Sequence, residues 1–233
     1  MERLDKRLAN TGTWSRKEAR ELIRAGRVAA DGTVCRAPEQ KVPETAAVTV
    51  DGAPIGGGGP VYLMLNKPAG VVSSTDEPGE RTVIDLLGPE WRNRGLFPAG
   101  RLDKDTEGLL LITDDGPLAH RLLAPKRHVD KVYYVEVDGV LDQGDAEAVR
   151  AGIVLGDGTA CRPGELELLS GSAARITIHE GKYHQVKRML ASRGKPVRCL
   201  RRERFGPLIL DPDLPKGGWR ALTEEEIQAL FRQ

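Results

Sequence analysis

Residues 100–116 carry the side chains best suited to chemistry. The sequence there is a polar loop bounded by glycines, followed by an apolar run and a glycine-containing turn. Loops held by a rigid strand are common positions for reactive groups. Asp103 lies between Arg101 and Lys104, and neighbouring positive charges favour an ionised carboxylate. The pattern indicates either an available carboxylate or an aspartate that only stabilises its own turn.

Asp103 and Asp105 could instead hold Mg²⁺ in a nuclease or phosphatase. Such a site needs further carboxylates or histidines that converge on the ion. Glu107 and Asp114 are the nearby candidates, but the adjacent basic residues disfavour a concentrated cation site. A glycosidase would need a second acid in a defined setting, which the sequence does not offer. We therefore expect no metal site.

Basic side chains gather in two parts of an almost neutral chain. The 233 residues carry a formal net charge of +1 at pH 7, yet residues 182–204 hold nine lysines and arginines against one glutamate. Residues 1–30 hold eight basic side chains against four acidic ones. Two such concentrations favour binding to a polyanion, although a solvated charged surface would give the same pattern.

The composition is that of a globular cytoplasmic protein. No run of eighteen apolar residues is present, and the first residues lack an apolar leader, so we expect neither a membrane span nor secretion. The three cysteines are scattered and odd in number, which suits a reducing compartment. A monomer is the default expectation.

A run of four glycines and a proline, residues 56–60, predicts a flexible linker. It separates a domain of residues 1–55 from a domain of residues 61–233. The smaller domain has the pattern of two helices followed by short strands. Ser15 and Glu18 have the spacing of a capping box at the start of the second helix. Asp31 and Gly32 suit the positive φ angles of a tight hairpin turn.

The second helix of the smaller domain carries four arginines on one side. Because a helix turns by 100° per residue, they cluster within about 80°; they are Arg16, Arg20, Arg24 and Arg27. They could form a solubilising face with Glu18 and Glu21 as partners. A phosphate backbone would also relieve their mutual repulsion, and each guanidinium can clamp a phosphate with paired donors.

The larger domain alternates β-like runs with a few helices. Strands are predicted at residues 61–65, 108–113, 131–137 and 175–179, and helices at 118–123, 142–150 and 184–193. This order, with connections of hairpin length, favours an α+β fold around a mixed, mainly antiparallel sheet.

Four motifs in order carry a resemblance to a known family. They are Asn66-Lys67-Pro68, the run of residues 100–116, Lys131-Val132-Tyr133, and residues 180–189. Together they resemble the pseudouridine synthases of the ribosomal small-subunit synthase A type. The smaller domain resembles the RNA-binding domain first described in ribosomal small-subunit protein four, which implies a docking module for structured RNA.

The resemblance implies a cofactor-free isomerisation of uridine in RNA. The target nucleotide is flipped out of its stack, because its glycosidic bond cannot be reached otherwise. Asp103 matches the family's aspartate and would act as nucleophile or proton-abstracting base. The uracil then detaches, rotates and rejoins the ribose through carbon. No metal, ATP or other cofactor is required.

The resemblance also implies roles for other residues of this sequence. Lys187 is expected to pair with Asp103, with its neighbour Arg188 as the alternative partner. Tyr133 is expected to stack on the flipped base or relay a proton, unless it is a buried strand tyrosine. His184 is expected to be structural. The remaining candidates for contacts with RNA or substrate are Asn66 and Lys67 at the pocket floor, Arg101 in the gap left by the flipped nucleotide, and Lys182 and Arg188.

The finer resemblance concerns the substrate. Residues 74–76, 202–206, 210–214 and 222–227 resemble the small-subunit enzyme, whereas residues 215–219 resemble the large-subunit branch. The implied partner is 16S ribosomal RNA, in an assembling small subunit, with the uridine at position 516 of bacterial rRNA numbering as the expected target. The alternatives are a uridine of 23S ribosomal RNA, or an RNA-binding assembly factor that has lost its activity.

Overall fold

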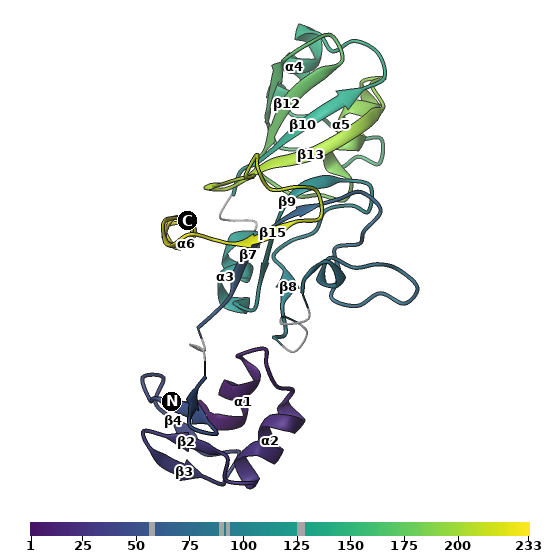
Figure 1. The fold of residues 1–233 in the computed structure, drawn as a ribbon. Helices are drawn as coiled ribbons and strands as arrows, with labels where there is room; N and C mark the ends of the chain where they lie inside the picture. Colours follow the sequence, from purple (N-terminus) through teal and green to yellow (C-terminus); the bar gives the residue numbers. More distant parts are fainter. Residues whose placement is uncertain (56–58, 89–90, 92–93, 125–128) are drawn as a thin grey trace. The chain divides into compact units, whose positions relative to one another are not determined.

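The structure is a computed structural model that describes residues 1–55, 59–88, 91, 94–124 and 129–233. The chain divides into two compact units (Figure 1). The first contains Met1–Val61 and Leu87–Phe97, and the second contains Tyr62–Leu86 and Pro98–Gln233. Residues 56–58 of the predicted linker lie outside the described residues.

The first unit is built from two short helices and small antiparallel sheets. Its helices are α1 (Leu4–Ala9) and α2 (Arg16–Arg24). The strand order of the main sheet is β3-β2-β5-β6, formed by β2 (Val28–Ala30), β3 (Thr33–Cys35), β5 (Val48–Val50) and β6 (Ala53–Pro54). A separate pair joins β1 (Glu2–Arg3) to β4 (Lys41–Val42). Leu4, Leu8 and Ile23 from the helices are fully buried in one core with Val28 and Val48.

Local signals in this unit have the structures they predict. The capping box at Ser15 and Glu18 is formed in both directions, and α2 ends at Arg24, just before Gly26. Asp31 and Gly32 have φ angles of 48° and 79° in the turn between β2 and β3. These predictions are confirmed. They could be made from the sequence because each feature depends on residues that are close together in the chain.

The second unit contains a large mixed sheet with the strand order β11-β12-β10-β13-β9-β7-β15. Strands β9 and β13 run parallel, and the other neighbours on this path run antiparallel. Short strands β8 and β14 pair with β9 and β13. The strand bounds are β7 Tyr62–Lys67, β8 Phe97–Pro98, β9 Glu107–Thr113, β10 Lys131–Val137, β11 Glu165–Leu168, β12 Ala173–Ile178, β13 Val197–Phe205, β14 Leu208–Ile209 and β15 Trp219–Ala221. The α+β prediction is confirmed.

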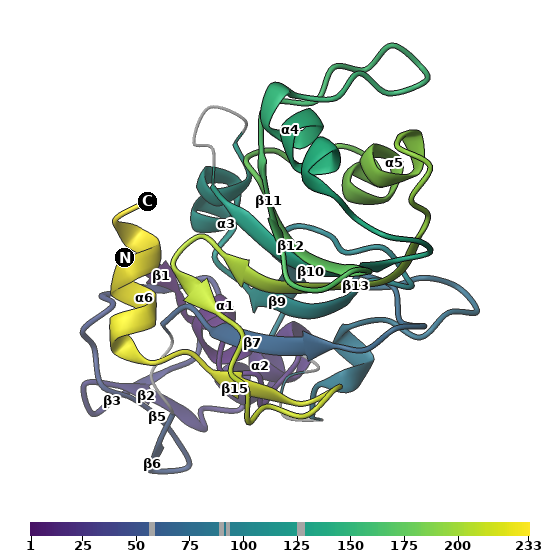
Figure 2. The ribbon, with the colours of Figure 1, turned by 90° about the horizontal axis from the view of Figure 1, so that it is seen from above.

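Helices cover the sheet, and α5 (Gln185–Ser192) carries part of the motif at residues 180–189. Their bounds are α3 Gly116–Leu123, α4 Gln143–Ala151, α5 Gln185–Ser192 and α6 Glu224–Phe231, with a 3₁₀ turn, η1, at Ile84–Leu86. In Figure 2, α4 and α5 lie over the part of the sheet made by β11, β12, β10 and β13. The central strands β7 and β9 are buried almost throughout, which explains their continuous apolar sequence.

Gly108 allows β9 and β13 to approach each other closely. Its φ angle is 101°, in the region that favours glycine. A Cβ at this position would lie 2.3 Å from the carbonyl oxygen of Arg202 on β13. The loop that carries Asp103 ends where β9 begins, so this contact fixes the base of the loop against the strand beside it.

Candidate active site

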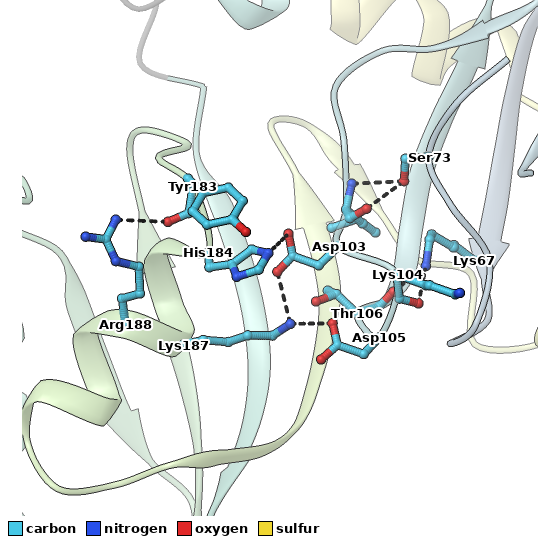
Figure 3. Close-up of polar contacts among 11 residues, drawn as sticks. Lys67, Ser73, Asp103, Lys104, Asp105, Thr106, Tyr183, His184, Lys187 and Arg188 are labelled. Carbon is cyan, nitrogen blue, oxygen red and sulfur yellow. Dashed lines mark hydrogen bonds and ion pairs between the residues drawn. The ribbon is translucent and has the colours of Figure 1, made fainter. Parts of the chain in front are cut away.

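The loop of residues 102–106 is held by side chains from the end of β7 and from the segment that follows it. The Ser73 hydroxyl donates to the Leu102 carbonyl at 2.8 Å and accepts from the Leu102 amide at 3.1 Å. The Lys67 ammonium donates to the carbonyls of Lys104 at 3.2 Å and Thr106 at 2.8 Å. Residues on both sides of Asp103 are therefore anchored, and its position is fixed by the backbone around it (Figure 3).

Lys67 is fully buried, although lysine is among the residues least often found inside a protein. A third hydrogen bond, to the Pro68 carbonyl at 3.0 Å, completes its set of donors. Burial lowers the pKa of Lys67 to about 8, and the nearby Asp105 and Asp103 carboxylates oppose that shift. Lys67 therefore remains mainly an ammonium at neutral pH and holds the loop through hydrogen bonds. It is not one of the residues that line the cavity described below.

Asp103 is surrounded by two basic side chains from the start of α5. The Lys187 ammonium lies 3.0 Å from Oδ2 of Asp103 and 2.5 Å from Oδ1 of Asp105. His184 Nε2 lies 3.5 Å from the other Asp103 oxygen, Oδ1. The Asp103 side chain is 28% exposed, so these pairs are partly shielded from water. Figure 3 shows both basic groups directed at the carboxylate.

The same ion pairs shift the pKa values of their members. Burial acts against the charge of Lys187, but the hydrogen bonds that its ammonium donates to Asp105 and Asp103 outweigh burial and raise the pKa of the lysine. The hydrogen bond from Lys187 lowers the pKa of Asp105. At neutral pH one ammonium is therefore shared between two carboxylates.

Arg188 points away from Asp103. Its guanidinium binds Asp157 at 2.5 Å and donates to the Tyr183 carbonyl at 3.3 Å. Consecutive helical side chains diverge by about 100°, so Lys187 and Arg188 cannot face the same group. Of the two candidate partners from the sequence, Lys187 is the one in contact with Asp103.

A cavity of about 600 Å³ opens beside Asp103. Tyr133 from β10 lines it and is 7% exposed, with Lys131 two residues earlier on the same strand face. Burial, and then the Arg202 guanidinium, lower the pKa of Lys131 to about 8. His184 lines the cavity as well. The volume is in the range of small-molecule pockets, and it brings a carboxylate, a phenol and an imidazole to one space.

The other candidates from the larger domain divide into two groups. Arg101 and Lys182 line the cavity. Within the described part of the chain, the Arg101 side chain has no hydrogen-bond or ion-pair partner, whereas Lys182 lies 3.2 Å from Glu180 and donates to the Ala160 carbonyl. Asn66 donates to the Leu214 carbonyl at 2.8 Å and, like Lys67, is not among the cavity-lining residues. We expected Asn66 and Lys67 to form the floor of the pocket. In the structure, both side chains instead bind backbone carbonyls and do not line the cavity.

The arginines of the first unit are organised by a buried carboxylate, Asp5. Arg16 and Arg20 each bind one of its oxygens at 3.1 Å, and Arg3 binds both at 3.0 Å. Asp5 is fully buried. Burial by itself would raise its pKa, but the hydrogen bonds from Arg3, Arg20 and Arg16 lower the pKa to about 2. The three arginine side chains are 43–50% exposed although they bind a buried carboxylate.

The two remaining arginines of the predicted face differ in position and in their contacts. Arg24 is the last residue of α2, whereas Arg27 lies beyond the helix, after Gly26, so the prediction that all four arginines lie on one helix face is wrong for Arg27. Arg27 forms an ion pair with Asp51. Among the residues that the structure describes, the Arg24 side chain has no hydrogen-bond or ion-pair partner.

Sequence reasoning missed the contacts of three residues. Asp5 was not considered, Asp105 was considered only as a metal ligand, and His184 was expected to be structural. The separation of three residues between His184 and Lys187 is a signal for a shared helix face. No local signal connects Asp5 to Arg16 and Arg20, which are 11 and 15 residues away.

A metal centre was also considered from the sequence. Within residues 1–55, 59–88, 91, 94–124 and 129–233, no three His, Cys, Asp or Glu side chains form a group that could hold a metal ion. The same ranges contain no helix that is long and apolar enough to cross a membrane.

The arrangement agrees with comparisons to known proteins. The family described as RNA pseudouridylate synthase matches residues 61–192, more than half of the chain. The chain belongs to the RNA pseudouridylate synthase family. The S4 domain family matches residues 2–48 of this synthase, so the predicted N-terminal resemblance is confirmed together with the catalytic one.

Relatives match the synthase over almost its full length. An uncharacterized RNA pseudouridine synthase of Bacillus subtilis is 45% identical and covers 98% of each chain. Ribosomal small subunit pseudouridine synthase A of Vibrio cholerae is 43% identical over 99% of this chain and 100% of its own. A crystal structure of a pseudouridylate synthase has a TM-score of 0.70 and 35% identity, covering 99% of this chain and 100% of that chain.

Proposed function

We propose that this synthase isomerises one uridine of 16S ribosomal RNA to pseudouridine, with Asp103 as the reacting carboxylate. The observation that carries the proposal is the position of Asp103, held between Lys187 and His184 beside a cavity that Tyr133 also lines. Full-length relatives named ribosomal small subunit pseudouridine synthase A, from Vibrio cholerae and Escherichia coli, support the choice of RNA.

Each side chain has a defined task in this proposal. Asp103 acts as nucleophile or as proton-abstracting base on the flipped uridine. Lys187 stabilises its charge at 3.0 Å, in surroundings where electrostatic interactions are stronger than in water. Tyr133 stacks on the uracil. Arg101, which extends at the cavity without a partner among the described residues, occupies the space that the flipped nucleotide leaves. The bonds are exchanged within one molecule, so no cofactor takes part.

RNA docking is assigned to the smaller domain, residues 1–55, and catalysis to residues 61–233. The S4 match over residues 2–48 supports the first assignment. The exposed donors of Arg16, Arg20, Arg24 and Arg27 suit phosphate groups, because a guanidinium can bind a phosphate through two parallel hydrogen bonds. The partner is then 16S ribosomal RNA or an assembling small subunit.

The test is tritium release from 5-³H-uridine in 16S ribosomal RNA and in small-subunit particles. Asp103→Asn should abolish release while the variant still binds the RNA. Asp213→Asn, which makes the same change at an exposed carboxylate, serves as the control. Release near the wild-type rate from Asp103→Asn would refute the role of Asp103.

Mapping pseudouridine in both ribosomal RNAs then tests the choice of substrate. Modification of 23S ribosomal RNA alone would move the substrate to the large subunit, as residues 215–219 would favour. Binding without any isomerisation by the wild type would leave an RNA-binding assembly factor.

A further inference from the structure

Tyr183 is an aromatic side chain that the proposed reaction does not use. It is 75% exposed, although a tyrosine ring offers a large apolar surface that proteins usually bury. It follows three residues that line the cavity, Glu180, Gly181 and Lys182, and precedes His184, which lines it too. The ring therefore stands at the edge of the site, in contact with solvent.

The Tyr183 ring is held parallel to the imidazole of His184. The two ring centroids are 3.9 Å apart and the planes differ by 17°. One face of the phenol is thus covered by His184, and the exposed fraction comes from the opposite face and the edge. Figure 3 shows the two rings stacked next to Asp103.

The backbone fixes this pair relative to the reacting carboxylate. His184 has φ 46° and ψ 37°, a left-handed conformation that is uncommon for a residue with a side chain. It directs the imidazole to 3.5 Å from Asp103 at the point where α5 begins. The Tyr183 carbonyl accepts a hydrogen bond from Arg188 at 3.3 Å. The Tyr183 backbone is therefore held by Arg188, and its ring is stacked on His184.

We propose that Tyr183 is a stacking platform for an unpaired base of the substrate RNA next to the flipped uridine. Flipping removes the target from its stack and leaves a neighbouring base without a partner on one face. Stacking on an aromatic side chain contributes about 1–3 kcal/mol per base and tolerates any base. Lys182, Lys187 and Arg188 lie within five residues of Tyr183, but each is already paired with a carboxylate, so the exposed ring, and not charge, carries the proposal.

The platform rests on the proposed function, because it assigns a second nucleotide to the same site. It also gives the site a preference for targets in single-stranded or flexible RNA, where a flanking base can leave its helix. A ring that only supported His184 would have no need of an exposed second face.

The test compares Tyr183→Phe, which keeps the ring, with Tyr183→Leu, which keeps apolar bulk but removes the π face. The substrate is a 16S ribosomal RNA fragment with 2-aminopurine at either neighbour of the modified uridine. Stacking quenches 2-aminopurine, so full-length wild type and Tyr183→Phe should quench one of the two positions and Tyr183→Leu should not. The kcat/KM of Tyr183→Leu should fall about 5- to 150-fold, as expected for the loss of one stack worth about 1–3 kcal/mol. Phe231→Leu, the same change at an exposed ring of α6, is the control.

Two results would overturn the platform. One is unchanged quenching and kcat/KM in Tyr183→Leu. The other is a lower kcat with unchanged quenching, which would assign Tyr183 to the support of His184. Failure of the proposed function is distinguishable, because wild type would then modify no uridine. The quenching comparison on a short single-stranded oligonucleotide containing 2-aminopurine would still support or reject stacking.

Discussion

Replacing Asp5 with asparagine should destabilise the first unit by an amount that depends strongly on pH. Asp5 is fully buried and is neutralised by Arg3, Arg16 and Arg20. Asparagine keeps the shape of the side chain but removes its charge, and its amide NH₂ would face a guanidinium. Breaking a buried ion pair by removing one partner is costly, because the remaining charges lose their compensation.

The magnitude follows from the pKa of Asp5, which falls from 3.8 to about 2 on folding. Each unit of pKa difference corresponds to about 1.4 kcal/mol, so the ionised carboxylate contributes about 2–3 kcal/mol to the free energy of unfolding. Because the pKa is lowered in the folded state, this contribution is complete above pH 4–5 and is lost as the pH falls through about 2. At pH 2.5 it should amount to less than about 1 kcal/mol.

The assay is urea unfolding at pH 7 and pH 2.5, read by the NMR amide signals of residues in α1 and α2. This readout follows the first unit separately from the second. Asp5→Asn should lose about 2–3 kcal/mol at pH 7 and much less at pH 2.5. Asp51→Asn is the matched control, because Asp51 binds Arg27 at the surface and half of its side chain is exposed. The reasoning fails if both variants behave alike at pH 7, or if the Asp5→Asn deficit is equal at the two pH values.

Two further substitutions test the second unit. Lys187→Gln should lower the single-turnover rate constant for tritium release about a hundredfold, in the range found when one charge-stabilising donor is removed, and Lys187→Arg should recover part of that rate. Lys216→Gln, at an exposed ion pair with Glu107, is the control in the same assay. Equal rates for wild type and Lys187→Gln would exclude the proposed charge stabilisation. Gly108→Ala should destabilise the second unit by about 3 kcal/mol or more, because the added Cβ would lie 2.3 Å from the Arg202 carbonyl oxygen at a φ of 101°. Gly116→Ala is the control, since a Cβ there would meet nothing within 4 Å. Equal melting temperatures of the two variants would contradict this prediction.

Several individual elements could be predicted from the sequence, but β11, β13, β15 and α6 were not among them, and the arrangement of the sheet could not be predicted. The predicted strand at residues 131–137 has the bounds of β10, and the predicted helices at 142–150 and 184–193 agree with α4 and α5 to within one residue at each end. Periodicity, caps and glycines act within a few residues, so they can be read locally. The order of the sheet places β9 beside β13, about ninety residues later in the chain, and no local pattern encodes that neighbour.

The candidate site has the same division between local and tertiary information. The motif around Asp103 and its resemblance to a family depend on residue types in a fixed order, and these are properties of the sequence. The sharing of Lys187 between Asp103 and Asp105 depends on α5 meeting a loop more than eighty residues away. The choice between Lys187 and Arg188 was open in the sequence, and the direction of one turn of α5 decides which of them contacts the carboxylate.

The sequence by itself determined the chemistry that is available: a carboxylate in a glycine-bounded loop, a tyrosine on a buried strand, and basic side chains at a helix start and along an N-terminal helix. Only the tertiary structure decided which of these groups meet. It showed that Lys67, expected at the pocket floor, and Asp5, not considered from the sequence, position other residues. The physical reason is that a buried charge is stable only where several distant segments converge to satisfy it, and such convergence is a property of the folded chain.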